Sequence, residues 1–405
     1  MMFPTKRLGE IADFKNGLNF QQSQEGVNIK FLGVGDFQDR TVIVDMSLLG
    51  SITLDFIPKE EALLKDGDLV FVRSNGSKEL VGRCVMVYPR QTPLAYTGFA
   101  IRARINDTKT VSPFFVLQHI QNGLLKQSVK REGSGTNISN LNQDILAGLE
   151  IPLPPLPEQN AIADTLSTWD AAIEKTERLI AAKEKLFRRD RIEEIHHPED
   201  GRASWSPLGR IFQAMTRKNS VGETNVLTTS AQRGLVSQRK YFTKSVASEN
   251  LENYFLLEKG QFAYNRSSSN GYPYGAVKRL EDSDRGVLST LNICMALIDP
   301  AAHNSDYFVH ALESGVLNRG LGQICQEGAR SHGLLNVSRE DFFSLEVPAP
   351  TKPIQDAIAK RLNLASLEID LMKRRLKLLQ TQKRGLMQKL LTGTWRVKYL
   401  GATNG

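Results

Sequence analysis

The sequence predicts an α+β protein made of two similar mixed α/β domains, which two long antiparallel coiled-coil helices join and separate. Three observations give this prediction. A proline-rich segment at residues 151–159 precedes a long stretch whose apolar residues are spaced alternately four and three apart, a pattern typical of a coiled-coil helix. The same arrangement returns 196 residues later. The stretches that precede the two proline-rich segments also resemble each other, so the chain contains a pseudo-two-fold internal repeat.

The order of these parts divides the chain into five. We expect residues 1–153 to form the first globular domain and residues 154–200 the first long helix. Residues 201–350 are expected to form the second domain, residues 351–397 the second long helix, and residues 398–405 a tail. With 405 residues and 40% hydrophobic composition, the chain is long enough to give each domain its own core.

The first domain is predicted to consist mainly of short strands. Alternating or β-branched runs at residues 41–44, 69–72, 84–87 and 100–105 are separated by Gly, Asn and Pro. A helix is expected over residues 113–126, with its apolar face at Phe114, Leu117, Ile120 and Leu124.

The first long helix is expected to begin at Pro157, because proline is well suited to a first helical turn and the preceding prolines prescribe an extended chain. Thr176 and Lys183 interrupt its apolar seam. The seam residues are Ile162, Leu166, Trp169, Ile173, Ile180 and Phe187.

The second domain repeats the first. The pattern Leu-Gly-x-Ile at residues 8–11 returns at residues 208–211. At an offset of 193, Leu64, Gly67, Arg73, Ser74, Gly82, Thr97, Ala103 and Ile105 match Leu257, Gly260, Arg266, Ser267, Gly275, Thr290, Ala296 and Ile298. We therefore expect two domains with one fold and different surfaces.

The second long helix has the same seam, in which Lys383 is the polar member and Ala365 a small one. The other seam residues are Ile358, Leu362, Ile369, Met372, Leu376, Leu379, Leu386 and Leu390. If the two halves are equivalent, a two-fold axis makes the helices antiparallel partners. About 38 residues at 1.5 Å each give a rod of roughly 57 Å, longer than the ~34 Å of one DNA turn. Such a rod could act as a ruler.

Composition favours an anionic partner. The net charge is +8 and the isoelectric point is near 9.3. Residues 354–400 contain eleven Lys or Arg against three acidic residues, so we expect a positive face on the second helix. Cys84, Cys294 and Cys325 lack metal or disulfide spacing. We therefore expect no metal, and we expect no cofactor. Because no apolar leader or membrane-length run occurs, we expect a soluble cytoplasmic protein without membrane contact.

Both domains contain a strand that ends in Arg and continues into a polar, glycine-containing loop, at residues 67–76 and 260–271. Such an Arg can reach a guanine edge or a phosphate, and Ser, Asn and Gly bring short donors near phosphate oxygens. The alternative is a hairpin turn whose Arg makes a structural ion pair. Polar loops at residues 130–137 and 326–333 also suit phosphate binding, although such loops often only turn the chain. The candidate DNA-binding residues are Arg73, Ser74, Asn75, Lys78, Lys130, Arg131, Asn137, Arg266, Ser267, Ser268, Asn270, Tyr272, Arg330 and His332.

No catalytic motif is found. The sequence lacks a Walker A motif, a complete G-x-G-x-x-G, H-E-x-x-H and the Asn-Pro-Pro-aromatic motif of adenine methylation. The six His have no ligand spacing. We therefore expect a protein that is not an enzyme.

The sequence resembles the specificity subunit of type I restriction-modification systems. The resemblance is carried by Pro-Leu-Pro-Pro-Leu-Pro-Glu-Gln-x-Ala-Ile-Ala at residues 152–163, by its repeat at 348–359, and by Lys-Arg-Gly-Leu-Met-Gln-Lys-Leu-Leu-Thr-Gly at 383–393. It covers the whole architecture. The chain departs from the family pattern at residues 351–354, where the second copy lacks the fuller Pro-Leu-Pro-Glu, and in a short extra tail.

The resemblance implies a non-catalytic DNA-recognition subunit. Each globule would be a target recognition domain that reads one half of a split sequence in double-stranded DNA. The helices would be the spacer and the docking surface for two methyltransferase subunits, with the seam residues named above at that surface, and restriction or motor subunits would join through the complex. The alternatives are a specificity-like scaffold or decoy that binds methyltransferase subunits without reading DNA, and an enzyme in its own right.

Overall fold

A computed structural model describes residues 3–19, 25–37, 40–76, 79–124, 141–196, 204–238, 250–327 and 335–397. The chain divides into two compact units. Unit 1 comprises Met1–Glu177 and Arg375–Gly405, and unit 2 comprises Arg178–Arg374. Each unit therefore contains one globule and a part of both long helices, and the two are described separately.

Unit 1 has a five-stranded sheet in the order β2-β9-β6-β7-β4. Its strands are β2 (Ala12–Asn16), β9 (Ala100–Ile105), β6 (Asp68–Val72), β7 (Cys84–Val87) and β4 (Val42–Ile43). A second sheet has the order β5-β3-β8, with β5 (Ser51–Leu54), β3 (Val27–Leu32) and β8 (Leu94–Tyr96). The remaining elements are β1 (Thr5–Arg7), which pairs with β10 (Glu150–Pro152), and the helices α1 (Leu8–Ile11), α2 (Pro113–Gln121) and α4 (Gln143–Ala147).

Unit 2 has a four-stranded sheet in the order β12-β19-β16-β17. Its strands are β12 (Phe212–Ala214), β19 (Ile293–Leu297), β16 (Phe262–Asn265) and β17 (Ala276–Arg279). Paired strands surround it: β11 (Trp205–Pro207) with β22 (Glu346–Pro348), β13 (Leu227–Ser230) with β14 (Gly234–Ser237), β15 (Phe255–Glu258) with β18 (Arg285–Leu288), and β20 (Gln326–Glu327) with β21 (Leu335–Asn336). The short helices are α6 (Leu208–Ile211), α8 (Ser305–Glu313), α9 (Asn318–Ile324) and α10 (Arg339–Ser344).

The two globules share the order of four core strands, which confirms the predicted internal repeat. The strand order β2-β9-β6-β7 of unit 1 corresponds to β12-β19-β16-β17 of unit 2. The repeated glycines have a backbone reason: Gly67 and Gly260 have φ +83° and +88°, and Gly82 and Gly275 have φ +83° and +79°. These left-handed conformations are costly for residues with a Cβ, so the turns that flank β6 and β16 need glycine in both copies.

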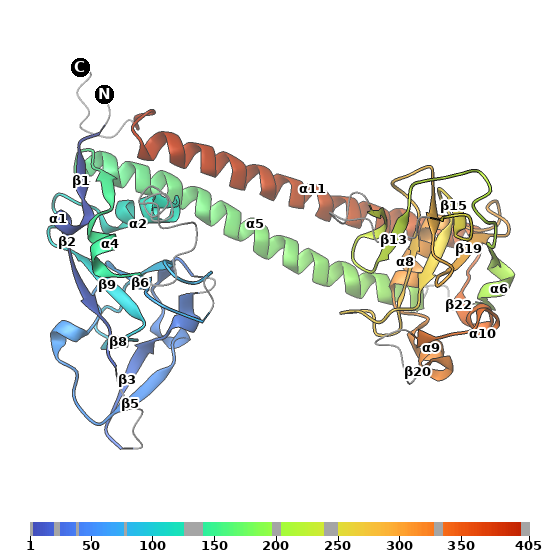
Figure 1. Ribbon diagram of the computed structural model, residues 1–405, viewed down its shortest axis with the longest axis horizontal. Helices are drawn as coiled ribbons and strands as arrows, with labels where there is room; N and C mark the ends of the chain where they lie inside the picture. Colours follow the sequence, from blue (N-terminus) through green and yellow to red (C-terminus); the bar gives the residue numbers. More distant parts are fainter. Residues whose placement is uncertain are drawn as a thin grey trace. The chain divides into compact units, whose positions relative to one another are not determined.

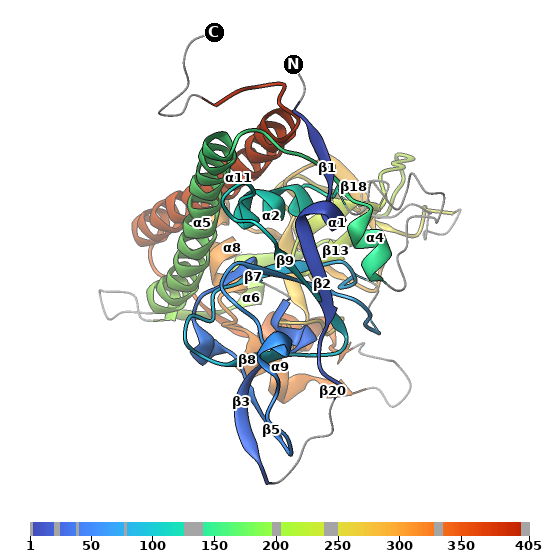
Figure 2. The same ribbon diagram turned by 90° about the vertical axis from the view of Figure 1, so that its left-hand side faces the viewer.

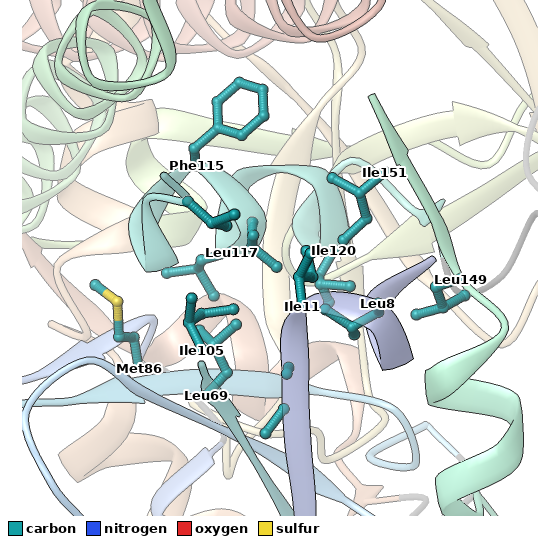
Figure 3. Close-up of a cluster of buried hydrophobic side chains, with 14 of the residues drawn as sticks. Leu8, Ile11, Leu69, Met86, Ile105, Phe115, Leu117, Ile120, Leu149 and Ile151 are labelled. Carbon is teal, nitrogen blue, oxygen red and sulfur yellow. The ribbon is translucent and has the colours of Figure 1, made fainter. Parts of the chain in front are cut away.

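The core of unit 1 forms between the large sheet and the helices. Leu117 and Ile120 of α2 are buried with Leu69 and Ile105 of the sheet and with residues of α1 (Figure 3). The same cluster continues into the long helix α5 (Leu156–His196) through Ile162 and Leu166. Figure 2, in which unit 1 faces the viewer, shows α2 between the sheet and α5. The first turns of α5 are therefore part of the globule's core.

The long helices α5 and α11 (Lys352–Leu391) run antiparallel in each unit (Figure 1, green and red). In unit 1, Asp170 of α5 pairs with Lys383 of α11, and Gln380 donates a hydrogen bond to Glu177. In unit 2 the interhelical pairs are Lys183–Glu368 at 2.7 Å, Glu184–Lys373 at 2.7 Å and Glu194–Arg361 at 2.8 Å. Residues later in α5 thus pair with residues earlier in α11. The antiparallel helix pair predicted from the sequence is therefore confirmed.

The apolar seam of these helices is withdrawn from solvent. Ile162, Leu166, Ile180, Ile358, Leu362, Ile369 and Leu390 are buried, and Trp169, Ile173, Phe187, Met372, Leu376, Leu379 and Leu386 are half-buried. The structure shows why two lysines can occupy positions in the apolar seam. Lys183 and Lys383 each extend to a carboxylate on the opposite helix, so the charges in the seam are compensated.

The same interhelical pairs change the interpretation of the basic second helix. Three of its cations, Arg361, Lys373 and Lys383, pair with carboxylates of α5, and so does Arg396, which follows the helix. The excess positive charge that was expected to form a continuous face is thus partly neutralised by the neighbouring helix.

A buried glutamine joins each globule to its long helix. In unit 1 the Oε1 of Gln159 accepts a hydrogen bond from the N–H of Ser112 at 2.9 Å, and its Nε2 donates to the carbonyl of Pro154 at 2.8 Å. In unit 2 Gln355 accepts from the N–H of Asn304 at 2.8 Å and donates to the carbonyl of Pro350 at 2.7 Å. The repeated glutamine of the proline-rich segments is therefore a joint between the helix start and the loop before α2 or α8.

The departure from the repeat at residues 351–354 also has a structural counterpart. Glu158 in the first copy is fully buried and binds the guanidinium of Arg396 through two hydrogen bonds of 2.6 Å. The equivalent residue of the second copy is Ile354, which packs against the core of unit 2. An ion pair between a buried carboxylate and a half-exposed arginine thus ties the segment after α11 to the start of α5 in unit 1, and Ile354 makes an apolar contact at the equivalent position of unit 2.

The helix predicted over residues 113–126 ends earlier than expected. In the structure α2 ends at Gln121, because Asn122 caps it and Gly123 turns the chain with φ +85°. The strands expected at residues 84–87 and 100–105 occur with those bounds. Every helix in the described ranges is too short or too polar to cross a membrane.

Candidate nucleic-acid interface

In both units the central strand of the sheet ends at the predicted arginine. Arg73 follows β6, and Arg266 follows β16. The N–H of Leu141 donates to the carbonyl of Arg73 at 2.8 Å, and the N–H of Leu335 donates to the carbonyl of Arg266 at 2.8 Å. The loop after the central strand therefore meets the chain that leads into α4 or α10, and in both units this loop carries all of the candidate DNA-binding residues that the structure describes.

The two arginine side chains are used differently. Arg73 is half-buried, and its guanidinium has no hydrogen-bond or ion-pair partner among the described residues. Arg266 is also half-buried, but its Nε donates to the carbonyl of Leu291 at 2.8 Å and its Nη1 donates to the carbonyl of Val337 at 3.2 Å. These contacts give Arg266 a structural role in holding three segments together. They favour the alternative of a structural Arg in unit 2 and leave Arg73 as the arginine with donors available for a ligand.

Tyr272 is engaged inside unit 2. Its hydroxyl donates to a carboxylate oxygen of Glu313 at 2.9 Å, and its ring lies below the ammonium of Lys278, which is paired with the same Glu313. Burial raises the pKa of the Tyr272 phenol to about 12. The hydroxyl is thus already used in an internal network, which argues against the predicted DNA contact through this group.

The remaining described candidates lie around the two strand ends. The N–H of Ser74 donates weakly to the carbonyl of Phe99 at 3.4 Å, and the N–H of Ser267 donates to Asn265 at 3.0 Å. Asn75, Ser268 and Asn270 are exposed. Six further candidates, Lys78, Lys130, Arg131, Asn137, Arg330 and His332, lie outside the described residues.

The long helices expose an apolar set that the sequence reasoning missed. Leu364, Leu367 and Leu371 of α11 are each more than half exposed. Their spacing of three and four residues places them on one face of the helix, and that face is separate from the buried seam. The seam residues are withdrawn from solvent, so the surface available for a protein partner lies on residues such as these leucines. The signal was present in the sequence as a second leucine series beside the first.

Burial shifts the pKa of several histidine and cysteine side chains in the described part of the chain. Burial lowers the pKa of His119 in α2 to about 4 and raises the pKa of Cys294 in β19 to about 12. Among the described residues no group of three or more His, Cys, Asp or Glu side chains could hold a metal ion. His119, His310 and Cys294 belong to the packed interior, and His196, His303, Cys84 and Cys325 are partly buried.

Comparison with protein-family models matches residues 3–184 to the type I restriction modification DNA specificity domain. A Methanocaldococcus jannaschii protein described as the MjaX specificity subunit of a type I restriction enzyme is 24% identical over 95% of this chain and 91% of that protein. The StySPI specificity subunit of Salmonella potsdam is 30% identical over 41% of this chain and 36% of that protein.

Solved structures show the same fold over the full length. The S subunit of the type I restriction-modification system from M. genitalium aligns with a TM-score of 0.53 and 16% identity over 96% of both chains. A chain from a structural study of assembly of the type I restriction-modification system aligns with a TM-score of 0.57 and 14% identity over 97% of this chain and 98% of that chain.

Proposed function

We propose that this chain is a specificity subunit of a type I restriction-modification system, as its matches to that family support, and that it reads a split DNA target with one globule for each half. The observation that carries this proposal is the repeated strand end. Both units place an arginine and a polar loop at the end of the central strand, beside the loop that leads into α4 or α10. Two similar supports with different side chains are suited to reading two different half-sequences.

We propose that base recognition in unit 1 depends on Arg73. Its guanidinium has donors that no described residue uses, and a guanidinium can bind the O6 and N7 of guanine with two hydrogen bonds. In unit 2 the exposed Ser268 and Asn270 are better placed than Arg266 to contact DNA, because Arg266 is occupied with main-chain carbonyls. The two halves of the target would then be read by different kinds of side chain.

We propose that the long helices bind two methyltransferase subunits, and that restriction or motor subunits join through that complex. As a specificity subunit, this chain is the non-catalytic component. The exposed leucines Leu364, Leu367 and Leu371 support a docking surface on α11, since a row of apolar residues on a helix is suited to packing against a helix of a partner. The scaffold alternative would use this surface alone and would leave the strand ends without a function.

Adenine-methylation mapping tests the proposed function. DNA from cells that express this chain together with its methyltransferase subunit should carry methylated adenines in a split motif with an unspecified gap. Exchange of residues 1–153 for the corresponding domain of another specificity subunit should change one half of the motif only. Assembly with the methyltransferase in the absence of any methylated motif would instead support a scaffold.

A further inference from the structure

An exposed phenylalanine stands beside the candidate interface of unit 1. Phe99 lies in the turn between β8 and β9, and 62% of its surface is exposed. Its main chain is held on both sides: the N–H donates to Oγ1 of Thr97 at 3.2 Å, and the carbonyl accepts from the N–H of Arg73 at 2.7 Å. The turn therefore presents an apolar ring to solvent from a fixed backbone, directly next to Arg73.

Unit 2 has an exposed leucine at the equivalent turn. Leu291 lies between β18 and β19 and is 56% exposed. Its N–H donates to Oγ of Ser289 at 3.3 Å, and its carbonyl accepts from Nε of Arg266 at 2.8 Å. The carbonyl of this turn thus contacts the arginine at the end of the central strand in both units, through the main chain of Arg73 in one and the side chain of Arg266 in the other.

A single exposed apolar residue is ordinary on a protein surface and needs no explanation. The repetition is what distinguishes these two. The globules share the order of four core strands and differ in their surfaces, yet each has a large apolar side chain in the same turn, beside the strand end that carries the candidate interface. The two side chains stand one position apart in the repeat, because Phe99 corresponds to Asn292 and Leu291 to Gly98. The exposure at both turns leaves each side chain accessible to a ligand of its globule.

Double-stranded DNA offers apolar surface of two kinds at its bases. The C5-methyl group of thymine projects into the major groove, and apolar side chains contact it. The faces of adjacent base pairs become accessible when a base step opens, and Phe or Leu side chains can insert there. Both contacts need an exposed apolar side chain on a turn whose main chain is held by hydrogen bonds, and both turns meet these two conditions.

We propose that Phe99 and Leu291 each make an apolar contact with the bases of one half of the target, and so determine specificity together with the polar loops. This inference rests on the proposed function of the two globules. A phenyl ring and a leucyl side chain differ in shape, so the two contacts select different bases or base steps.

The test uses the full chain in complex with its methyltransferase subunit and a duplex that carries the mapped motif. Phe99→Ala should lower affinity for this duplex at least tenfold and relax base preference in the half read by unit 1. Leu291→Ala should do the same in the other half. Affinity for a duplex without the motif should remain unchanged, because phosphate contacts supply non-specific binding.

Matched variants separate this effect from a general loss of apolar surface or of folding. Ile57→Ala in unit 1 and Val221→Ala in unit 2 remove similarly exposed side chains from other loops, and both should bind as the wild type does. Phe99→Leu keeps an apolar side chain on the same turn and should recover part of the affinity. Unchanged thermal unfolding of the Phe99→Ala and Leu291→Ala proteins shows that the loss arises at the interface.

Base substitution in the duplex identifies the contact. If the side chain touches a thymine methyl group, deoxyuridine in place of that thymine should weaken the wild type and leave the Ala variant unaffected. If it enters a base step, 2-aminopurine at that step should brighten with the wild type and stay quenched with the Ala variant. Either result supports the proposal.

Two outcomes count against different parts of the argument. The apolar base contact is wrong if Phe99→Ala and Leu291→Ala bind the motif as the wild type does. It is also wrong if they bind more weakly but the size of this loss is the same for every base substitution in the duplex. In both cases the proposed function stands. If the wild-type complex itself shows no preference for any sequence, the proposed function fails instead.

Discussion

Arg73 and Arg266 occupy the same place in the repeat, and the structure separates their roles. The sequence alone predicts equal losses of DNA binding when either is replaced. Arg73→Ala should weaken binding to the target duplex by about 1 to 3 kcal/mol, the usual value of a two-bond contact with guanine. Arg266→Ala should mainly lower the free energy of unfolding of unit 2, because it leaves the carbonyls of Leu291 and Val337 without these donors.

Fluorescence anisotropy with the mapped duplex and urea unfolding distinguish the two roles. Arg73→Lys serves as the control, since it keeps the charge and loses the planar pair of donors. It should retain non-specific binding and lose base preference. If the Arg73→Ala protein keeps the base preference of the wild type, another residue reads this half of the target.

His119 gives unit 1 a pH dependence that can be measured. The side chain is buried against Phe115, and its Nε2 has no hydrogen-bond partner among the described residues. Burial lowers its pKa to about 4 from the ordinary 6.5. Below pH 6.5 the unfolded chain binds a proton that the folded chain excludes until about pH 4, so stability is full above pH 6.5 and is lost as the pH falls. At pH 5 the loss is about 2 kcal/mol.

The His119→Leu variant isolates this contribution. Carboxylates also titrate near pH 4 to 5, but they do so equally in both proteins. The difference in unfolding free energy between the variant and the wild type should therefore shift in favour of the variant by about 2 kcal/mol from pH 7.5 to pH 5. A difference that stays constant over this range would show that His119 is protonated in the folded state.

At the scale of elements, the seam has positions with different roles. Ile162 and Leu166, near the start of α5, belong to the core of unit 1, so a polar substitution there would disrupt the globule as well as the helix pair. Ile180 in α5 is a cleaner position for a test, because it is buried on the helix beyond the globular core clusters of the described residues. Ile180→Asp should destabilise the helix pair of unit 2 by at least ~2 kcal/mol, since it buries a carboxylate without a partner.

The adjacent Leu179 provides the control for this substitution. It is half exposed, so Leu179→Asp should change stability by no more than about 0.5 kcal/mol. Urea unfolding followed by helical circular dichroism measures both variants, and co-purification with the methyltransferase subunit reports assembly. Equal stability of the two variants would show that Ile180 is not part of a seam.

Elements were easier to predict than contacts. The seam spacing, the repeated glycines of positive φ and the strands β7 and β9 depend on local patterns, and the sequence displays such patterns directly. The end of α2 was misplaced because a favourable apolar spacing continued past Gly123. The use of Arg266 and the pairing of Glu158 with Arg396 depend on residues 25 to 238 positions away, which no local pattern reveals.

At the scale of the whole molecule, helix length should set the gap between the two half-sequences. We expect this because the globules carry the candidate base-reading residues and the helices carry none. Insertion of four residues after Glu177 in α5, with four more after Arg374 in α11, lengthens both helices by about 6 Å. These positions leave the interhelical pairs within each unit intact.

The expected gap follows from helical geometry. Six ångströms correspond to about two base pairs at 3.4 Å each, and four helical residues rotate the chain by roughly 40° beyond one full turn, which two base pairs partly follow. Methylation mapping should therefore return the same two half-sequences with a wider gap. New half-sequences with the original gap would refute a ruler.

The joints formed by Gln159 and Gln355 bear on how such a protein could acquire new targets. Each glutamine accepts a hydrogen bond from a main-chain N–H in the loop before α2 or α8 and donates one to a main-chain carbonyl of the proline-rich segment. Main-chain groups are the same whatever side chains surround them. Substitutions on the reading surface can therefore accumulate during evolution without loosening the attachment to the helix, and a descendant can inherit the joint unchanged while its preferred DNA sequence changes.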